Sequence, residues 1–367
     1  MSALQQMWLG AAADGPALWS WGAGFRGALG LGNTTDYSSP KQVGALTTWA
    51  SVSGGVNHTL SVQTNGTLWA WGNNSFGQLG LGNITNYSSP KQVGALTAWS
   101  KISAGKASSA SIKTDGTLWF WGRNNFGQLG LGNIVDYSSP KQVGALTTWA
   151  TVSAGNYFSL AVKTDGTLWS WGNNTNGQLG LGNTTHYSSP KQVGALTGWS
   201  TVSAGSLDTV AIKTNGTIWS WGRNDNGQLG LGNITSYSSP MQIGALTTWS
   251  TVATGYKFSL AIKTDGTLWS WGLNNYGQLG LNNLANYSSP KQVGALTTWS
   301  KVSSGDQFSL ATTTAGALWS WGRNQYGQLG LGTGGPGTER RSPVQVGALT
   351  TWSNIATGRY FTLATKT

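Results

Sequence analysis

One 50-residue stretch of the chain, residues 199–248, alternates apolar and polar positions in short runs separated by turn residues. The alternation has the two-residue period of β-strands, and no run has the helical period. An Asn215-Gly216 pair between two of the runs is typical of a tight hairpin turn, because both residues tolerate positive φ. The unit is therefore predicted to fold as four short antiparallel strands, at residues 201–205, 209–213, 218–221 and 240–244.

This unit recurs along nearly the whole chain at a fixed period. The dipeptide Trp-Gly begins every 50 residues, at Trp21, Trp71, Trp121, Trp171, Trp221, Trp271 and Trp321. Seven repeats of a four-stranded unit of this length are the signature of propeller blades. The sequence therefore predicts an all-β fold, a seven-bladed β-propeller built from four-stranded antiparallel blades.

The two ends of the chain are predicted to complete one blade together. The chain ends after the second strand of a repeat, within residues 352–367, and the missing third strand appears near residues 17–22. Pairing of these N- and C-terminal strands closes the ring and covers sheet edges that would otherwise be exposed. Residues 1–367 are thus expected to form a single propeller domain.

Composition narrows the class of protein further. The 367 residues include 22 Trp and 55 Gly but no Cys, which excludes disulfides and thiolate chemistry. The net charge of +11 arises from 21 basic and 10 acidic residues, without a block of like charge. Many of the lysines recur at equivalent repeat positions, and a solvated rim accounts for them better than nucleic-acid binding. No stretch approaches the length of a membrane span and no signal peptide is evident, so membrane insertion is not expected.

The most constant part of the repeat resembles a known family. Residues 121–132 read Trp-Gly-x-Asn-x-x-Gly-Gln-Leu-Gly-Leu-Gly, and Ser-Ala-Gly and Asp-Gly-Thr-Leu-Trp motifs or close variants accompany this run in the repeats. These motifs are similar to the regulator-of-chromosome-condensation repeat. The resemblance covers essentially the whole chain, and it implies a seven-bladed propeller that binds proteins through loops on a rigid ring.

Two departures from the family limit the activity that the resemblance implies. The nucleotide-exchange factor of the family inserts a wedge within one blade, whereas the insertion here, within residues 333–341, adds three residues. The ultraviolet photoreceptor of the family carries Gly-Trp-Arg-His-Thr motifs, and the matching segments here, such as residues 55–59, contain no Trp. A nucleotide-exchange or nucleic-acid-associated role is therefore less favoured, and light sensing is not implied.

No constellation of residues in the sequence indicates catalysis. The two histidines, His58 and His186, lie in different repeats, and no paired carboxylates, metal-ligand spacing or nucleophile motif occurs. The Gly-Gln-Leu-Gly-Leu-Gly motif does not open a helix, so it is not interpreted as a phosphate-binding loop. The sequence predicts a non-enzymatic protein with no cofactor and no metal site.

Differences between the seven repeats are concentrated in three short segments. The first follows the glycine that ends the first strand, the second follows Trp-Gly, and the third precedes Tyr-Ser-Ser-Pro. Because consecutive antiparallel strands alternate in direction, all three segments are expected at the same end of the blades. Variation on one face of a constant frame favours a binding surface, with unselected drift of exposed loops as the alternative.

The first variable segment supplies the predicted binding residues. In each repeat this segment is a triplet, such as Asn156-Tyr157-Phe158. Tyr and Arg are frequent anchors of protein interfaces, and several of the seven triplets contain them or other charged residues. The third triplet position is in phase with buried strand residues, so Phe158 and its equivalents are expected in the core, where Asp208 would need a partner or water. The predicted binding residues are Asn57, His58, Lys106, Tyr157, Leu207, Asp208, Tyr256, Lys257, Asp306, Gln307, Arg359 and Tyr360.

The sequence favours a non-enzymatic scaffold that binds a protein partner through this variable face. The alternative is a structural or adhesive surface component, such as a virion or cell-surface protein. The low charge and the abundance of Asn, Thr, Ser and Gly are consistent with that alternative. The partner's identity, the cellular compartment and the oligomeric state stay open at this level.

Overall fold

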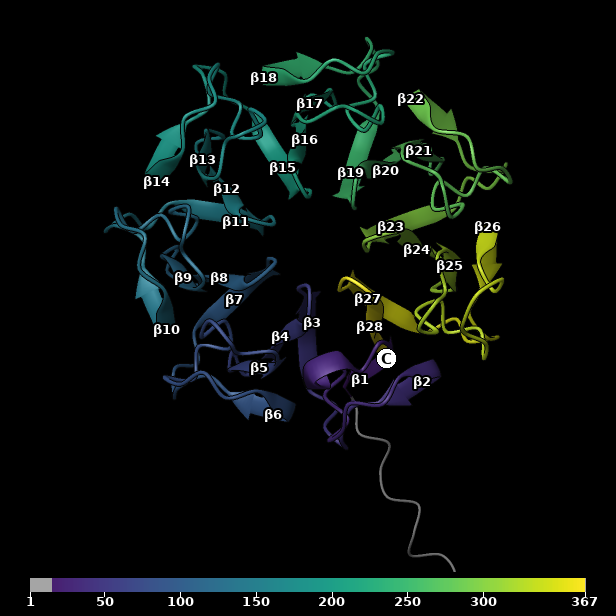
Figure 1. The fold of residues 1–367 in the computed structure, drawn as a ribbon, viewed down its shortest axis with the longest axis horizontal. Coiled ribbons are helices and arrows are strands. Elements are labelled where there is room, and N and C mark those ends of the chain that lie inside the picture. The colour runs from purple at the N-terminus through teal and green to yellow at the C-terminus, as the bar shows by residue number, and fades with distance from the viewer. Residues whose placement is uncertain (1–14, 367) are drawn as a thin grey trace, which may run out of the picture.

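The computed structural model describes residues 15–366, which form seven four-stranded antiparallel sheets around a central axis (Figure 1). The predicted seven-bladed β-propeller is confirmed. Within each blade the first strand of the repeat lies innermost and the fourth lies outermost. Residues 1–14 and 367, which the predicted domain also included, lie outside the described residues.

The strands occupy equivalent positions in the seven blades. The inner strands are β3 (Trp49–Gly54), β7 (Trp99–Ala104), β11 (Trp149–Ala154), β15 (Trp199–Ala204), β19 (Trp249–Thr254), β23 (Trp299–Ser304) and β27 (Trp352–Thr357). The second strands are β4 (His58–Gln63), β8 (Ser108–Lys113), β12 (Phe158–Lys163), β16 (Asp208–Lys213), β20 (Phe258–Lys263), β24 (Phe308–Thr313) and β28 (Phe361–Lys366). The third strands are β1 (Ala17–Gly22), β5 (Leu68–Gly72), β9 (Leu118–Gly122), β13 (Leu168–Gly172), β17 (Ile218–Gly222), β21 (Leu268–Gly272) and β25 (Leu318–Gly322). The outer strands are β2 (Tyr37–Gln42), β6 (Tyr87–Gln92), β10 (Tyr137–Gln142), β14 (Tyr187–Gln192), β18 (Tyr237–Gln242), β22 (Tyr287–Gln292) and β26 (Arg340–Gln345), and a 3-10 helix, η1 (Phe25–Gly27), follows β1.

The outer strand of each blade begins earlier than the sequence predicted. In the repeat used for the prediction, β18 begins at Tyr237 rather than at residue 240, because Tyr237 pairs with Gly222 across an irregularity in β17. Pro240 lies inside this outer strand, where a missing N–H is tolerated at a sheet edge. The other three strands of the repeat lie within one or two residues of their predicted bounds.

The first and last strands of the described chain pair as predicted. β1 and β28 are antiparallel, with an unbroken register from Ala17 opposite Lys366 to Gly22 opposite Phe361. The resulting sheet has the order β2-β1-β28-β27, which is the strand order of the other blades. Figure 1 shows this blade in purple and yellow, where the two ends of the colour scale meet.

Tryptophan side chains hold each blade together, and in six of the seven blades an indole N–H joins the blade to the preceding one. The ring of Trp199 lies 6.0 Å from that of Trp219 and 5.9 Å from that of Trp221, which is fully buried. The Trp221 indole N–H donates a 2.9 Å hydrogen bond to the carbonyl of Gln178 in the preceding blade. Gly180 has φ +73° beside this ring, and a Cβ at Gly180 would lie 2.7 Å from Trp221 Nε1. The glycine of the repeat is therefore required where backbone and tryptophan approach closely.

A seam of serine hydroxyls joins the inner strands around the axis. Ser203 Oγ accepts a 3.1 Å hydrogen bond from the backbone N–H of Thr254 in the next blade. Equivalent bonds link three further pairs of neighbouring blades, through Ser53, Ser103 and Ser153. Ala253 stands at the next equivalent position, and one blade further Ser304 Oγ is buried without a hydrogen-bond partner among the described residues. The seam is therefore interrupted between β19 and β23, and Ala356, at the same repeat position, interrupts it again between β27 and β3.

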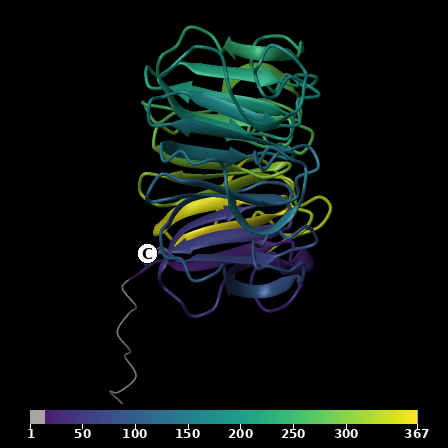
Figure 2. The ribbon, with the colours of Figure 1, turned by 90° about the vertical axis from the view of Figure 1, so that its left-hand side faces the viewer.

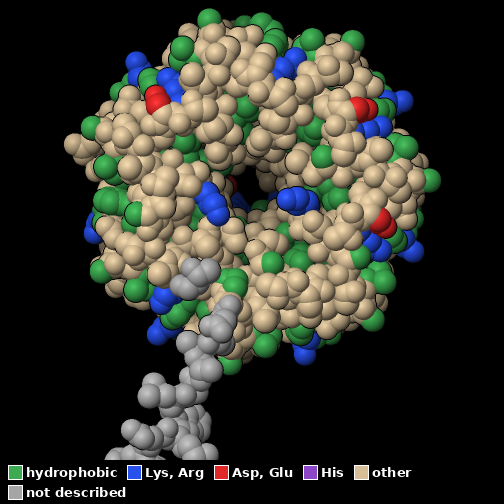
Figure 3. Space-filling view, turned by 180° about the vertical axis from the view of Figure 1, so that it is seen from behind, with side chains coloured by type: hydrophobic (Ala, Val, Ile, Leu, Met, Phe, Trp, Pro, Cys, Tyr) green, Lys and Arg blue, Asp and Glu red, His purple; other side chains and the backbone are tan. Residues whose placement is uncertain are grey.

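The two ends of the strands define two faces of the ring. The loops between first and second strands, and the segments that leave the third strands, begin at one end, which we call the variable-loop face. The turns between second and third strands, and between one blade and the next, lie at the other end, which we call the hairpin face. The β28 strand ends on the hairpin face, at the left of the ring in Figure 2, and Figure 3 is a view onto this face.

Candidate functional site

Contacts between side chains bring the three variable segments together at one end of the ring. The ring of Tyr157, in the first segment, lies 5.4 Å from that of Phe126, in the second segment of the preceding blade. Phe126 also lies 5.5 Å from His186, in a third segment. The shared face predicted from strand direction is therefore confirmed.

Tyr157 is at the centre of a group of cationic and aromatic side chains. The Arg123 guanidinium lies 4.5 Å from the ring centre of Phe76 in the preceding blade and 5.6 Å from that of Tyr157 in the following blade. The Lys106 ammonium lies 4.4 Å from the same tyrosine ring. Because aromatic faces attract cations, these contacts hold the guanidinium in place. We call these residues, with Phe126, the Tyr157 cluster.

The same arrangement recurs on the far side of the ring. The Arg323 guanidinium lies 5.1 Å from the ring of Tyr276 in the preceding blade and 5.2 Å from that of Tyr360 in the following blade. The ring of Tyr326 lies 5.1 Å from that of Tyr360, which corresponds to the 5.4 Å contact of Phe126 with Tyr157 in the first cluster. We call Tyr276, Arg323, Tyr326 and Tyr360 the Tyr360 cluster, and it repeats the arginine and the three aromatic rings of the Tyr157 cluster, whereas Asp306 stands at the position of Lys106.

Charged and polar residues extend the Tyr360 cluster. Arg359 Nε lies 3.3 Å from Asp306 Oδ2, and its guanidinium lies 4.8 Å from the Tyr360 ring. Gln307 Oε1 accepts a 2.8 Å hydrogen bond from Arg323. Burial, with the Asp306 charge, raises the pKa of Tyr360, which keeps its phenol protonated. A pocket of about 590 Å³ opens beside these residues, with a lining that includes Phe25, Arg26, Asn57, Tyr326, Arg359 and Tyr360.

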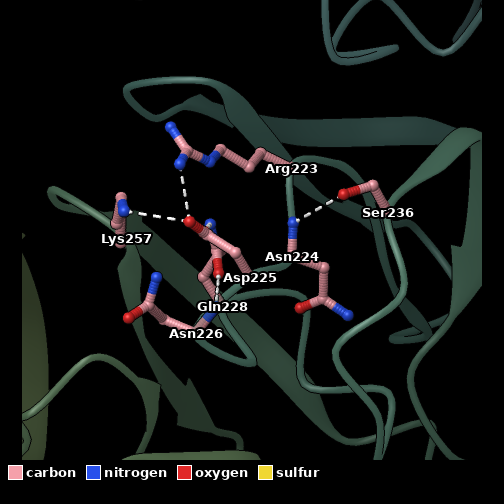
Figure 4. Close-up of polar contacts among 7 residues, drawn as sticks. All are labelled: Arg223, Asn224, Asp225, Asn226, Gln228, Ser236 and Lys257. Atoms are coloured by element: carbon pink, nitrogen blue, oxygen red, sulfur yellow. Dashed lines mark hydrogen bonds and ion pairs between the residues drawn. The ribbon is translucent and has the colours of Figure 1, made fainter.

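Arg223, Asp225, Gln228 and Lys257 form a third group, the Asp225 cluster, in the blades between these two clusters. Figure 4 shows its contacts. Asp225 Oδ2 is 2.6 Å from an Arg223 guanidinium nitrogen and 3.1 Å from Lys257 Nζ, and Asp225 Oδ1 accepts a 3.2 Å hydrogen bond from Gln228. Partial burial raises the pKa of Asp225, but hydrogen bonds led by those of Gln228 and Lys257 outweigh it and hold the pKa well below its usual range. Lys257 has φ +62°, a left-handed conformation that is uncommon for lysine. The loop is thus held in the conformation that brings Lys257 to the carboxylate.

The first residues of the seven triplets surround the mouth of the central channel. They line a depression of about 160 Å³ together with the adjacent glycines, and they are Val56, Lys106, Asn156, Ser206, Tyr256, Asp306 and Arg359. Asn156 Nδ2 donates a 2.7 Å hydrogen bond to Ser206 Oγ, and the Tyr256 backbone N–H donates to the Asp306 carbonyl at 3.2 Å. Bonds between neighbouring blades therefore stabilise parts of this mouth.

Two of the predicted binding residues, His58 and Asp208, lie beneath the variable-loop face rather than on it. Both are fully buried at the position that Phe158 fills in another blade. His58 Nε2 forms a 3.0 Å hydrogen bond with Ser109 Oγ, and burial lowers the pKa of His58 to about 4. Within residues 15–366 neither carboxylate oxygen of Asp208 has a well-formed hydrogen bond, and burial raises its pKa to about 8. The structure places both side chains in the core, away from any direct contact with a partner.

The second variable segment contributes residues that were absent from the predicted set. Arg123, Arg223 and Arg323 each take part in one of the three clusters, and they occupy the same position in alternate repeats. That recurrence is visible in the sequence and is the signal that could have identified them. Leu207 is partly exposed, and its carbonyl accepts the backbone N–H of Arg223 at 2.9 Å, which places it beside the Asp225 cluster.

The described part of the chain, residues 15–366, contains no group of three or more His, Asp or Glu side chains placed to hold a metal ion. In the same residues, no helix has the length and apolar character needed to cross a membrane. The chemistry that the variable-loop face offers is therefore that of cations, aromatic rings and hydrogen bonds.

A seven-bladed ring with constant blades and variable loop clusters on one face defines this protein as a β-propeller with a single differentiated surface. Sequence models of the RCC1-like domain match residues 6–252, and the regulator of chromosome condensation (RCC1) repeat matches residues 265–312 and 315–365. The chain belongs to the RCC1 repeat family. Among curated proteins, none matches the chain in sequence.

Solved structures of low sequence identity share the fold. Yeast RCC1 (Prp20), in a structure with Kap60, has a TM-score of 0.85 and 20 % identity over 96 % of this chain and 89 % of that chain. Prp20p from Saccharomyces cerevisiae, described with its binding properties to Gsp1p and histones, has a TM-score of 0.84 and 20 % identity over 96 % and 92 % of the two chains. Human WBSCR16 has a TM-score of 0.85 and 20 % identity over 96 % and 99 %. At this identity the likeness shows the propeller fold alone.

Proposed function

We propose that this protein is a non-enzymatic scaffold that binds a protein partner through its variable-loop face. The observation that carries the proposal is the pair of arginines, Arg123 and Arg323, each held between aromatic rings of two neighbouring blades. A guanidinium held in this way loses little conformational freedom when it forms hydrogen bonds to a partner. Such pre-ordered arginines are suited to act as anchors of an interface.

The residues around these arginines suit the same role. Tyr157 and Tyr360 are only partly buried, and each combines a large apolar area with a polar tip. Tyr and Arg are the residue types enriched among the dominant contacts of protein interfaces. The proposed contact residues are Asn57, Lys106, Tyr157, Leu207, Tyr256, Lys257, Asp306, Gln307, Arg359 and Tyr360, together with Arg123, Arg223 and Arg323.

The structural relatives support a binding role in general terms. Yeast Prp20 is described in complex with Kap60, and separately with binding to Gsp1p and histones. RCC1-like propellers are typically binding or exchange factors rather than catalysts. A nucleotide-exchange role is not proposed, because the exchange factor of the family inserts a wedge within one blade. The insertion here, within residues 333–341, lengthens its repeat by only three residues.

The test compares capture of partners by three forms of the immobilised full-length protein. These are the unchanged protein, Arg123→Ala/Arg323→Ala, and a charge-matched control, Lys101→Ala/Lys301→Ala, whose lysines are exposed near the hairpin end of the inner strands. Captured proteins from a lysate of the source organism are quantified by mass spectrometry, and thermal unfolding shows that each variant is folded.

The arginine variant should capture at least about tenfold less of the specific partner than the unchanged protein does, since truncation of a central anchor has an effect of this size. The lysine control should retain that partner. Capture of the same proteins in the same amounts by the unchanged protein and the arginine variant would refute the proposed face.

A further inference from the structure

Exposed leucines form a ring on the hairpin face, opposite the face proposed for protein binding. Each lies in the turn that joins the outer strand of one blade to the inner strand of the next, and each is 44–52 % exposed. Scattered exposed leucines are ordinary on protein surfaces, but here an equivalent leucine recurs in every blade on the same face. This leucine ring consists of Leu46, Leu96, Leu146, Leu196, Leu246, Leu296 and Leu349.

The turns that carry the leucines lie at the tip of this face. The Trp99 backbone N–H donates a 3.1 Å hydrogen bond to the carbonyl of Gly66, in a β4–β5 hairpin turn, which ties the two kinds of turn together. Gly94 belongs to the same turn as Leu96, and a Cβ built there would meet no atom of residues 15–366 within 4 Å. The turns therefore project from the packed body of the ring.

Lysines accompany the leucines on the hairpin face. Lys163 Nζ lies 3.9 Å from the ring of Trp169 and 5.1 Å from that of Trp149, and Lys113 and Lys263 repeat this stacking. The lysines towards this end of the strands are Lys101, Lys113, Lys163, Lys213, Lys263, Lys301 and Lys366, whereas the acidic residues described in its turns are Asp115, Asp165 and Asp265. The face is therefore net positive. Figure 3 shows lysine and arginine side chains at its edge and beside the central opening, interspersed with hydrophobic ones.

Grooves between neighbouring blades open beside the leucine ring. One of about 420 Å³ is lined by Leu131, Leu146, Trp149, Trp169 and Lys163, among others. A second, of about 350 Å³, has Leu96 and the equivalent tryptophans in its lining. Apolar walls beside a lysine ammonium suit a molecule with an apolar part and an anionic part.

We propose that the hairpin face binds the surface of an anionic lipid bilayer. The leucines at the turn tips enter the boundary between headgroups and acyl chains, and the lysines attract anionic headgroups. The seven turns lie at the same end of the ring (Figure 2), so several weak contacts form at once and reinforce one another. The contact needs no membrane-spanning segment, and it does not rest on the proposed protein-binding function.

The positive charge and the exposed leucines of the hairpin face together favour an anionic bilayer over a second copy of the chain or a nucleic acid. A second copy of the chain bound face to face would bring two sets of lysines together, and like charges oppose that contact. A nucleic acid would neutralise the lysines but leave the leucine ring in water. A bilayer with anionic lipids satisfies the lysines and buries the leucines.

The test is co-sedimentation of the full-length protein with two kinds of vesicle. Pure phosphatidylcholine vesicles are compared with vesicles that contain about one-third phosphatidylserine. We expect binding to the anionic vesicles to be at least about tenfold stronger and to weaken as salt is added. Failure to bind the anionic vesicles at low salt would overturn the proposal.

Two matched triple variants test whether vesicle binding depends on the leucine ring or on exposed apolar side chains in general. Leu96→Ser/Leu146→Ser/Leu196→Ser removes part of the ring and should weaken vesicle binding by about tenfold or more. Ile84→Ser/Ile134→Ser/Ile234→Ser removes isoleucines that are 66–68 % exposed and belong to the third variable segments, and it should leave vesicle binding unchanged.

Equal losses in the two variants would show that the hairpin face is not the contact. Full binding by the leucine variant, together with complete displacement of vesicles by a nucleic acid, would show attraction to polyanions in general. Either result would overturn the bilayer assignment.

Discussion

The buried carboxyl group of Asp208 predicts that the stability of the fold falls as pH rises. Asp208 starts β16 at the position where four other blades have phenylalanine, and it is 0 % exposed. Within the described chain, neither of its oxygens has a well-formed hydrogen bond, and desolvation raises its pKa to about 8. The folded protein therefore keeps this carboxyl group protonated under conditions in which the unfolded chain has lost the proton.

The pKa values fix the sign and the size of the effect. A carboxyl whose pKa is raised on folding binds more protons in the folded state, so stability is lost progressively between its unfolded value, 3.8, and its folded value, about 8. Each pH unit in that window costs about 1.4 kcal/mol, which sets a ceiling of about 4 kcal/mol between about pH 5 and pH 8. His58 acts in the opposite sense below its unfolded value of 6.5, because burial lowers its pKa to about 4. Comparison of variants that all keep His58 cancels that contribution.

The assay measures urea unfolding midpoints at several pH values for the unchanged protein, Asp208→Asn and Asp208→Phe. The asparagine variant removes the titrating group, and the phenylalanine variant restores the residue that Phe158 and its equivalents supply in other blades. Both variants should gain stability over the unchanged protein as pH rises, by an amount on the order of 2–4 kcal/mol across the window. A difference between each variant and the unchanged protein that is the same at every pH would refute the reasoning.

Three further predictions concern positions where a repeat departs from most of the others or where the frame is tight. Ala253→Ser should extend the hydroxyl seam from β19 to β23 by accepting from the Ser304 backbone N–H, and it should raise the free energy of unfolding by about 1 kcal/mol in urea titrations; no gain would show that this interruption is without cost. Gly180→Ala should lower that free energy by about 2 kcal/mol or more, because φ is +73° and the new Cβ would lie 2.7 Å from Trp221 Nε1; an unchanged thermal midpoint would contradict this. Asn282, at φ +59° where the other repeats have glycine, should change stability by less than about 1 kcal/mol on replacement by glycine, because asparagine tolerates this conformation; a larger change in thermal midpoint would point to a side-chain role.

The frame of the protein could be predicted from the sequence because its repeat is nearly constant. Recurrence of Trp221 and its equivalents at a fixed spacing identifies the blades, and the strand left unpaired at the chain end identifies the closure with β1. The outer strand begins earlier than the alternation predicts, because its first residue, Tyr237, pairs across an irregularity next to Gly222. An alternation pattern read from the sequence assumes an unbroken ladder and does not contain that shift.

The candidate site could be predicted only in part, because its clusters form between blades. Variation between repeats identified the triplet of Tyr157, and strand phase correctly placed Phe158 in the core. The contact of Arg123 with Phe76 and Tyr157 joins residues of three successive blades, so it depends on how far each blade is rotated from the next. That rotation is a property of the closed ring, and no local pattern in the sequence encodes it.

The separation of the two faces has a consequence for how the proposed contacts combine. The second strands span six residues, so about 20 Å of packed sheet separates the leucine ring from the variable loops. Hydrogen bonds such as that of Trp221 to Gln178 fix each blade to its neighbour, so neither contact requires a change in the ring. A protein bound to a bilayer through its hairpin face would therefore present the whole variable-loop face away from the lipid. Vesicle-bound protein should capture its partner as well as free protein does, and Arg123→Ala/Arg323→Ala should bind vesicles normally. Competition between vesicles and the partner would mean that the two contacts share a face, and one of the two assignments would then be wrong.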